Sequence, residues 1–122
     1  TKNPLHDSRV DLLDELLSPM LPKGWYCRTQ NFLLTPDSCP EPDVAVVRGR
    51  SMDYEVRHPT AADCALVIKV AVSSVDLDRR KGGIYARAGV PEYWIANLED
   101  WQLECWCRPD ADGKYRESTI LK

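Results

Sequence analysis

The sequence has no apolar run of the roughly 18–20 residues that a membrane-spanning helix requires. It also has no excess of positive charge, because 16 lysine and arginine residues stand against 19 aspartate and glutamate residues, a net charge of −3. No overall positive field attracts nucleic acid, so any contact with DNA needs a local basic patch. The 122 residues, 43% of them hydrophobic, predict a single domain over residues 1–122 with no membrane partner.

The cysteines follow no metal-binding or disulfide pattern. There are five of them, an odd number, and no Cys-x-x-Cys unit is repeated. Cys105 and Cys107 fall on one face of a strand, which suits packing better than tetrahedral metal ligation. The sequence therefore predicts free thiols and a cytoplasmic location.

Hydrophobic periodicity predicts an α/β fold. Apolar residues from Val10 to Met20 recur at helical spacing after a cap at Asp7 or Ser8, and a second helix follows Ser73-Ser74. Strands are predicted over residues 25–34, 44–47, 65–72, 92–96 and 102–108, with a further strand over 115–121, and residues 49–62 are predicted to be a loop. This order indicates a mixed β-sheet flanked by helices.

Lys69 departs most from its surroundings. It lies within the apolar segment Ala65–Val72, with Val67 and Ala71 on its own face. A buried lysine needs a carboxylate partner or loses its charge. Two interpretations are open: the strand end is exposed and Lys69 reaches water, or its face borders a polar site where Asp43 of the neighbouring strand pairs with it.

Asp43 begins a strand directly after Pro40-Glu41-Pro42. It either completes the turn or belongs to a metal-phosphate site, since Mg²⁺ takes one or two protein carboxylates and completes its shell with water and phosphate. Glu41 is a second candidate metal ligand if the turn is extended, although most turn glutamates are simply solvated.

A charged run, Asp78-Arg79-Arg80-Lys81, lies near the start of the second helix. Such a run is ordinarily a solvated helix face, but three adjacent cations also offer a local phosphate-binding patch. Lys81 shares a helix face with Tyr85.

His6 and His58 are predicted to be surface residues, and the four tryptophans are predicted to serve in packing.

Three segments together resemble the Uma-two family of restriction-endonuclease-like proteins, in the PD-(D/E)XK superfamily. They are Pro42–Val47, Leu66–Ala71 and Tyr85–Ile95, and the stretch AGVPEYWI at residues 88–95 is the most specific. The resemblance spans roughly residues 4 to 108. It implies a restriction-endonuclease-like core in the order α-β-β-β-α-β.

The resemblance also implies cleavage of DNA with Mg²⁺ or Mn²⁺. Asp43 matches the family's first metal carboxylate, and Lys81 matches a lysine that this family carries on the helix. The candidate catalytic residues are therefore Asp43, Lys69 and Lys81, and the candidate metal ligands are Asp43 and Glu41.

Lys69 falls where the family has a metal-binding glutamate, so a cation replaces a carboxylate. At about 4 Å and an effective dielectric constant near 20, each unit-charge interaction is worth roughly 4 kcal/mol. We therefore expect a metal that binds weakly if at all, and either a weak endonuclease or an inactive nuclease-fold protein that binds nucleic acid or another chain.

The chain also lacks the family's usual N-terminal segment, a helix and a hairpin with its own glutamate. It is thus expected to be a shortened member, and a remnant held together by self-association is a third interpretation. A homodimer is predicted through the terminal hairpin, which carries Trp101 and Trp106.

Overall fold

The structure is a computed structural model that describes residues 3–122; residues 1 and 2 of the predicted domain lie outside the described residues. Helix α1 (Pro4–Leu17) begins almost at the start of this range. The helix starts earlier than the apolar periodicity predicts, and Asn3 rather than Asp7 or Ser8 caps it. The Asn3 side chain accepts hydrogen bonds from the backbone N–H groups of Leu5 and His6. Proline in the first turn costs no hydrogen bond, because those N–H groups have no intrahelical partner.

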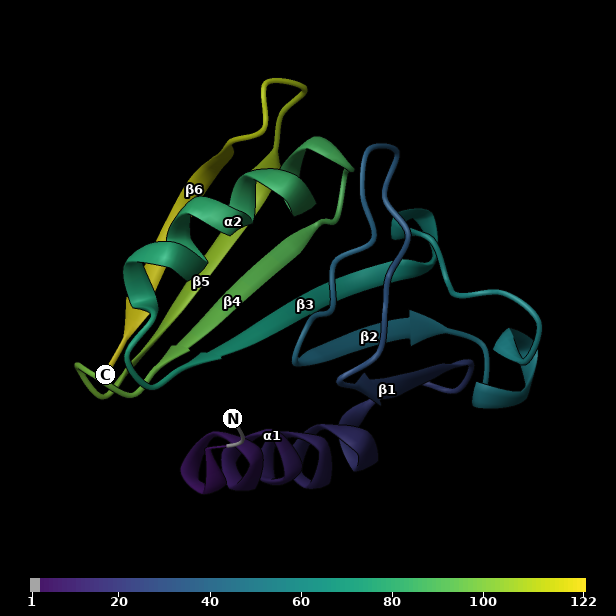
Figure 1. The fold of residues 1–122 in the computed structure, drawn as a ribbon, viewed down its shortest axis with the longest axis horizontal. Helices are drawn as coiled ribbons and strands as arrows, with labels where there is room; N and C mark the ends of the chain where they lie inside the picture. The colour runs from purple at the N-terminus through teal and green to yellow at the C-terminus, as the bar shows by residue number, and fades with distance from the viewer. Residues whose placement is uncertain (1–2) are drawn as a thin grey trace.

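A mixed six-stranded sheet in the order β1-β2-β3-β4-β5-β6 forms the centre of the fold (Figure 1). The strands are β1 (Trp25–Thr29), β2 (Val44–Arg48), β3 (Cys64–Ala71), β4 (Glu92–Asn97), β5 (Gln102–Pro109) and β6 (Tyr115–Leu121). Only β3 and β4 run parallel, and helix α2 (Val75–Arg87) connects them. The predicted α/β class and the α-β-β-β-α-β order are confirmed, with β5 and β6 added at one edge.

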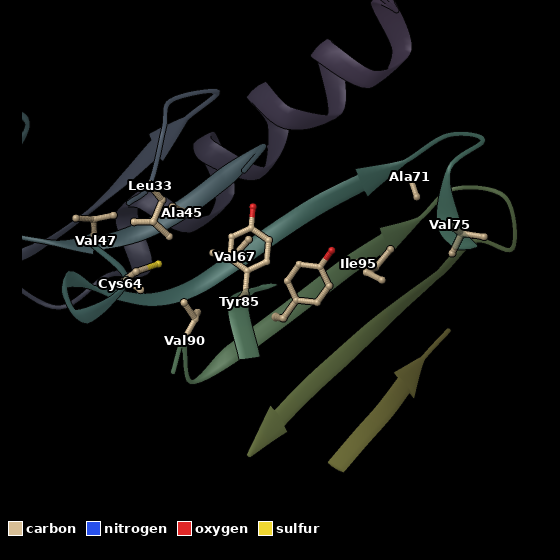
Figure 2. Close-up of a cluster of buried hydrophobic side chains, with 12 residues drawn as sticks. Leu33, Ala45, Val47, Cys64, Val67, Ala71, Val75, Tyr85, Val90 and Ile95 are labelled. Carbon is tan, nitrogen blue, oxygen red and sulfur yellow. The ribbon is translucent and has the colours of Figure 1, made fainter. Parts of the chain in front are cut away.

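The two helices cover opposite faces of the sheet. On one face Val10 of α1 packs against Val44, Ile68 and Val70. On the other face, beneath α2, a larger cluster includes Val67, Tyr85 and Ile95 (Figure 2). Since side chains alternate along a strand, β3 buries both its faces, which explains why it is nearly all apolar.

The connection from β1 to β2 differs most from the prediction. Strand β1 ends at Thr29 rather than at Leu34, because Gln30 takes a left-handed conformation with φ of 50°. Residues 30–43 then cross the sheet on the side of α2, where Leu33 is buried and Leu34 bridges to Thr60 (Figure 1). The predicted loop over 49–62 also contains a 3₁₀ turn, Ser51–Tyr54.

All five cysteines are free thiols. Within residues 3–122, neither α-helix combines the length and the apolar character that crossing a bilayer demands.

Candidate functional site

A concavity of about 630 Å³ lies where β2 begins and β3 ends. Its polar lining includes His6, Glu41, Asp43, Lys69, Ser74 and Asp78. These side chains come from α1, the β1–β2 connection, β3 and α2, so the topology gathers distant parts of the chain at one end of the sheet.

Asp43 is held by the backbone of the neighbouring strand. The β2–β3 register pairs Val44 with Ile68, so Asp43 lies one position before the ladder begins. There its Oδ2 accepts a hydrogen bond from the Val70 N–H at 2.7 Å. The carboxylate thus replaces a missing ladder partner, which explains why a 7% exposed aspartate is tolerated.

Lys69 pairs with Asp43 across the sheet. The two residues lie on the same face, and Lys69 Nζ is 3.6 Å from Asp43 Oδ1. The side chains of Lys69 and Asp43 are only 17% and 10% exposed, so water screens their charges poorly. Of the two interpretations, the structure places Lys69 against a polar site rather than at an exposed strand end.

His6 also contacts Asp43, although the sequence indicates a surface residue. Its Nε2 lies 3.2 Å from Asp43 Oδ1, and its Nδ1 lies 3.3 Å from Asp7 Oδ1. A neutral ring donates a hydrogen bond to one of these carboxylates, and a protonated ring donates to both. The His6 side chain is 25% exposed, and the prediction missed its contact with Asp43, which arises because α1 starts at Pro4 and its first turn packs near the beginning of β2.

Asp78 is a second buried carboxylate in the concavity, at 4% exposure. Burial raises its pKa and the nearby Asp43 charge raises it further, whereas the Ser74 hydroxyl and the Lys69 ammonium oppose the rise. Its conformation is fixed, since Ser74 Oγ donates to Oδ2 at 2.9 Å and the Tyr93 hydroxyl donates to its backbone carbonyl at 2.6 Å. The sequence shows Asp78 only as part of a charged run, so its burial is a finding of the structure.

Lys81 lines a neighbouring cavity of about 250 Å³ rather than the Asp43 concavity itself. Lys69 and Glu41 line both cavities, so they connect Lys81 to the Asp43 side. Glu41 is exposed, as is Lys81. The three predicted catalytic residues therefore lie in two adjoining cavities, with Lys69 between the other two.

An ion pair between the partly exposed Arg79 and the buried Glu104 fixes the start of α2 against the sheet. Arg79 donates to both carboxylate oxygens of Glu104, through Nε at 3.0 Å and through Nη2. Asn97 also donates to Glu104, at 3.1 Å. These hydrogen bonds, chiefly that of Arg79, hold the pKa of Glu104 below its usual range.

Glu99 completes the attachment of α2. Its carboxylate accepts the N–H of Val75 at 3.0 Å, whereas Ser74 occupies the cap position without capping through its side chain. Helix α2 thus starts directly after Ser73-Ser74, as predicted, with Ser74 at its N-cap position, and the turn after β4 supplies the side-chain acceptor.

The arrangement does not provide a ready magnesium site. One oxygen of Asp43 already accepts the Val70 N–H, and the other faces Lys69 and His6. In the part of the chain that the structure describes, no three His, Cys, Asp or Glu side chains are grouped to hold a metal ion. Mg²⁺ requires free oxygen ligands in octahedral geometry, and these residues do not fit it as they stand.

A mixed sheet with helices on both faces carries an aspartate and a lysine where β2 begins and β3 ends, and this fold is restriction-endonuclease-like. The chain belongs to the family Uma2, described as "Putative restriction endonuclease", which matches residues 1–122. This confirms the family that the three sequence segments indicate.

Two solved structures are similar to this chain. A "putative nuclease belonging to DUF820" from Anabaena variabilis has a TM-score of 0.66 at 13% identity, over 98% of this chain and 68% of that one. NucC from E. coli MS115-1, in its apo form, has a TM-score of 0.51 at 16% identity, over 76% of this chain and 46% of that one. At such identities the likeness establishes the fold alone. The curated proteins include no match to this sequence.

Proposed function

We propose that this chain is a DNA endonuclease of low activity, which cleaves phosphodiester bonds beside Asp43 and binds Mg²⁺ or Mn²⁺ weakly. The observation that carries the proposal is the Asp43–Lys69 ion pair, in which an ammonium lies 3.6 Å from a carboxylate oxygen. The family supports the reaction class. The ion pair supports the low activity, because Lys69 repels a second cation at the same carboxylate.

Two lysines are suited to bind the DNA backbone. Lys69 and Lys81 line the smaller cavity, where Glu41 is the only carboxylate among the described lining residues. Cations held beside a phosphate attract it and stabilise the charge that develops during its displacement. Lys81 is the candidate for this stabilisation, since Lys69 is already paired with Asp43. Asp43 and Glu41 are the candidate ligands of a weakly bound metal, and the buried Asp78 lines the same concavity.

A second candidate function is binding without cleavage. It is favoured by the same carboxylate, because both Asp43 oxygens already have contacts in the folded chain. In this case the protein keeps the nuclease fold and holds DNA, or another protein chain, at the two lysine-lined cavities.

A plasmid-nicking assay with Mn²⁺ or Mg²⁺ separates the two functions. We expect slow nicking by the unmodified chain and none by Asp43→Asn, which still offers an oxygen to the Val70 N–H; circular dichroism checks that this variant is folded. Lys81→Gln should slow nicking about tenfold or more, in the range of other electrostatic groups that act on a developing charge. Rapid cleavage that Asp43→Asn leaves unchanged would place the chemistry elsewhere. Binding of the plasmid by the protein without any nicking would favour the binding function.

A further inference from the structure

A separate cavity of about 310 Å³ lies on the other side of α2 from the Asp43 site, between that helix and strands β4, β5 and β6. Arg79 and Arg80 line it from the helix, Trp106 from β5, and Lys114 from the turn before β6. Figure 1 shows α2 running alongside these strands, at the edge of the sheet away from β1.

The charge of this cavity is opposite to that of the whole chain. Three cationic side chains line it and, among the described residues, no aspartate or glutamate does, although the chain carries a net charge of −3. Arg79 is occupied by Glu104 and Asp76. Arg80 and Lys114 form no ion pair with any described residue. Two cations are therefore free to meet an anion.

Trp106, one of the lining residues, carries an unsatisfied hydrogen-bond donor. The indole Nε1 of Trp106 is buried and, within residues 3–122, is the one buried side-chain nitrogen or oxygen without a partner. A buried N–H without an acceptor is costly, so native structures rarely keep one. The tyrosine hydroxyls of the lining are already used, because Tyr93 donates to Asp78 and Tyr115 donates to Val90. Among the uncharged lining side chains described, the Trp106 N–H is therefore the donor without an acceptor.

Aromatic rings form part of the cavity wall. The rings of Tyr93 and Tyr115 stack with their centroids 6.1 Å apart. At Gly83 an added Cβ would lie 3.2 Å from the Gly113 carbonyl oxygen, so the helix and the turn approach closely at one end of the cavity. Free cations, a free donor and aromatic walls are together suited to a small oxyanion, alone or carried on a ring.

We propose that this cavity binds a small phosphate-bearing ligand, with Arg80 and Lys114 meeting its charge and Trp106 Nε1–H donating to one of its oxygens. The proposal does not depend on DNA cleavage at Asp43. The phosphate could be free or esterified, and the two sources share the same recognition chemistry.

Proton–nitrogen correlation spectra of the full labelled chain test the proposal directly. The four tryptophans give four indole signals, and Trp106→Phe identifies the one that belongs to Trp106. Inorganic phosphate and adenosine 5′-monophosphate are titrated separately, with sodium chloride holding the ionic strength constant. We expect the Trp106 signal to move to lower field and to saturate, while the other three indole signals stay in place.

Charge variants supply the matched controls. Arg80→Gln and Lys114→Gln remove exposed charges at the cavity, and each should weaken binding about threefold. Lys23→Gln removes an exposed charge elsewhere and should leave binding unchanged. Trp106→Phe should weaken binding about tenfold, measured by calorimetry, since a hydrogen bond to a charged group is lost.

Equal affinities for the two probes would indicate free phosphate, and tighter binding of the nucleotide would indicate a phosphate ester. A Trp106 signal that neither probe moves would overturn the proposal. So would a movement that chloride reproduces, or one that persists in the Arg80→Gln, Lys114→Gln double variant.

Discussion

Replacing Glu104 by glutamine should destabilise the fold by removing the charge that holds α2 in place. Glu104 is 1% exposed and accepts two hydrogen bonds from Arg79 and one from Asn97. A hydrogen bond between charged groups contributes about 1.5–3 kcal/mol, and breaking a fully buried pair costs about 3–5 kcal/mol. Because the Arg79 side chain is 39% exposed and water compensates part of the loss, we expect a cost of about 2 kcal/mol.

Urea unfolding of Glu104→Gln measures this cost, and Glu117→Gln is the matched control. Glu117 pairs with Arg108 on the surface, where both side chains are more than half exposed at 55% and 72%, so its replacement should change stability by less than about 0.5 kcal/mol. A double-mutant cycle with Arg79→Gln isolates the pair. Equal costs for Glu104→Gln and Glu117→Gln would refute the reasoning.

The same pair predicts how stability depends on pH. The pKa of Glu104 is lowered in the folded chain, chiefly by Arg79, so the native state binds its proton less tightly than the unfolded state does. Its contribution is therefore complete above the unfolded pKa of about 4.3 and is lost as the pH falls through the lower native pKa. The difference between the unmodified chain and Glu104→Gln should be constant near neutral pH and shrink in acid. A difference that grows in acid would contradict this assignment.

Three further predictions concern single positions. Gly82→Ala should destabilise the chain in urea unfolding, although alanine ordinarily favours a helix by about 1 kcal/mol, because its Cβ would lie 3.1 Å from the Tyr93 ring; a gain in stability would contradict the close contact. Asp78→Asn should stabilise the chain at neutral pH, since burial raises the pKa of Asp78 and penalises its charged form. That gain should vanish as the pH falls through the raised native pKa towards the unfolded value near 3.9, and a gain independent of pH would be inconsistent with it. Finally, sedimentation equilibrium should show a homodimer that Trp101→Glu or Leu121→Glu weakens, because Trp101 is 69% and Leu121 is 53% exposed beside the edge strand β6; a monomer at high concentration would disprove it.

The periodic elements were predictable from the sequence because their patterns reflect burial. Strand β3 is apolar on both faces since both faces are covered, and β6 matches its predicted range of 115–121. The strand predicted over residues 25–34 is longer than β1, because nothing in the composition signals the left-handed turn at Gln30. Lys69 interrupts an otherwise apolar segment, and this interruption indicates a polar neighbourhood, since a lysine in such a strand needs a partner.

The rest of the site depends on contacts between distant segments. His6 reaches Asp43 only because α1 packs across the beginning of β2, and no local pattern carries that information. In the sequence, Asp78 belongs to a charged run that is typical of a solvated helix face. Only the structure shows that the Tyr93 hydroxyl donates a hydrogen bond to its backbone carbonyl. Glu99 and Glu104 lie in the β4–β5 hairpin, yet both hold α2. Such roles follow from topology rather than from residue spacing.

Calorimetric titration with Mn²⁺ and Mg²⁺ tests most directly whether Lys69 weakens metal binding at Asp43. The unmodified chain is compared with Lys69→Glu and with Lys69→Gln, a neutral control of the same length as the glutamate. At 3.6 Å and an effective dielectric constant near 20, the Lys69–Asp43 interaction is about 4–5 kcal/mol, and a third of it corresponds to about tenfold in affinity. We predict weak or undetectable binding by the unmodified chain, at least tenfold tighter binding by Lys69→Glu, and an intermediate value for Lys69→Gln. Tight binding by the unmodified chain that Lys69→Glu does not improve would show that Lys69 does not weaken metal binding.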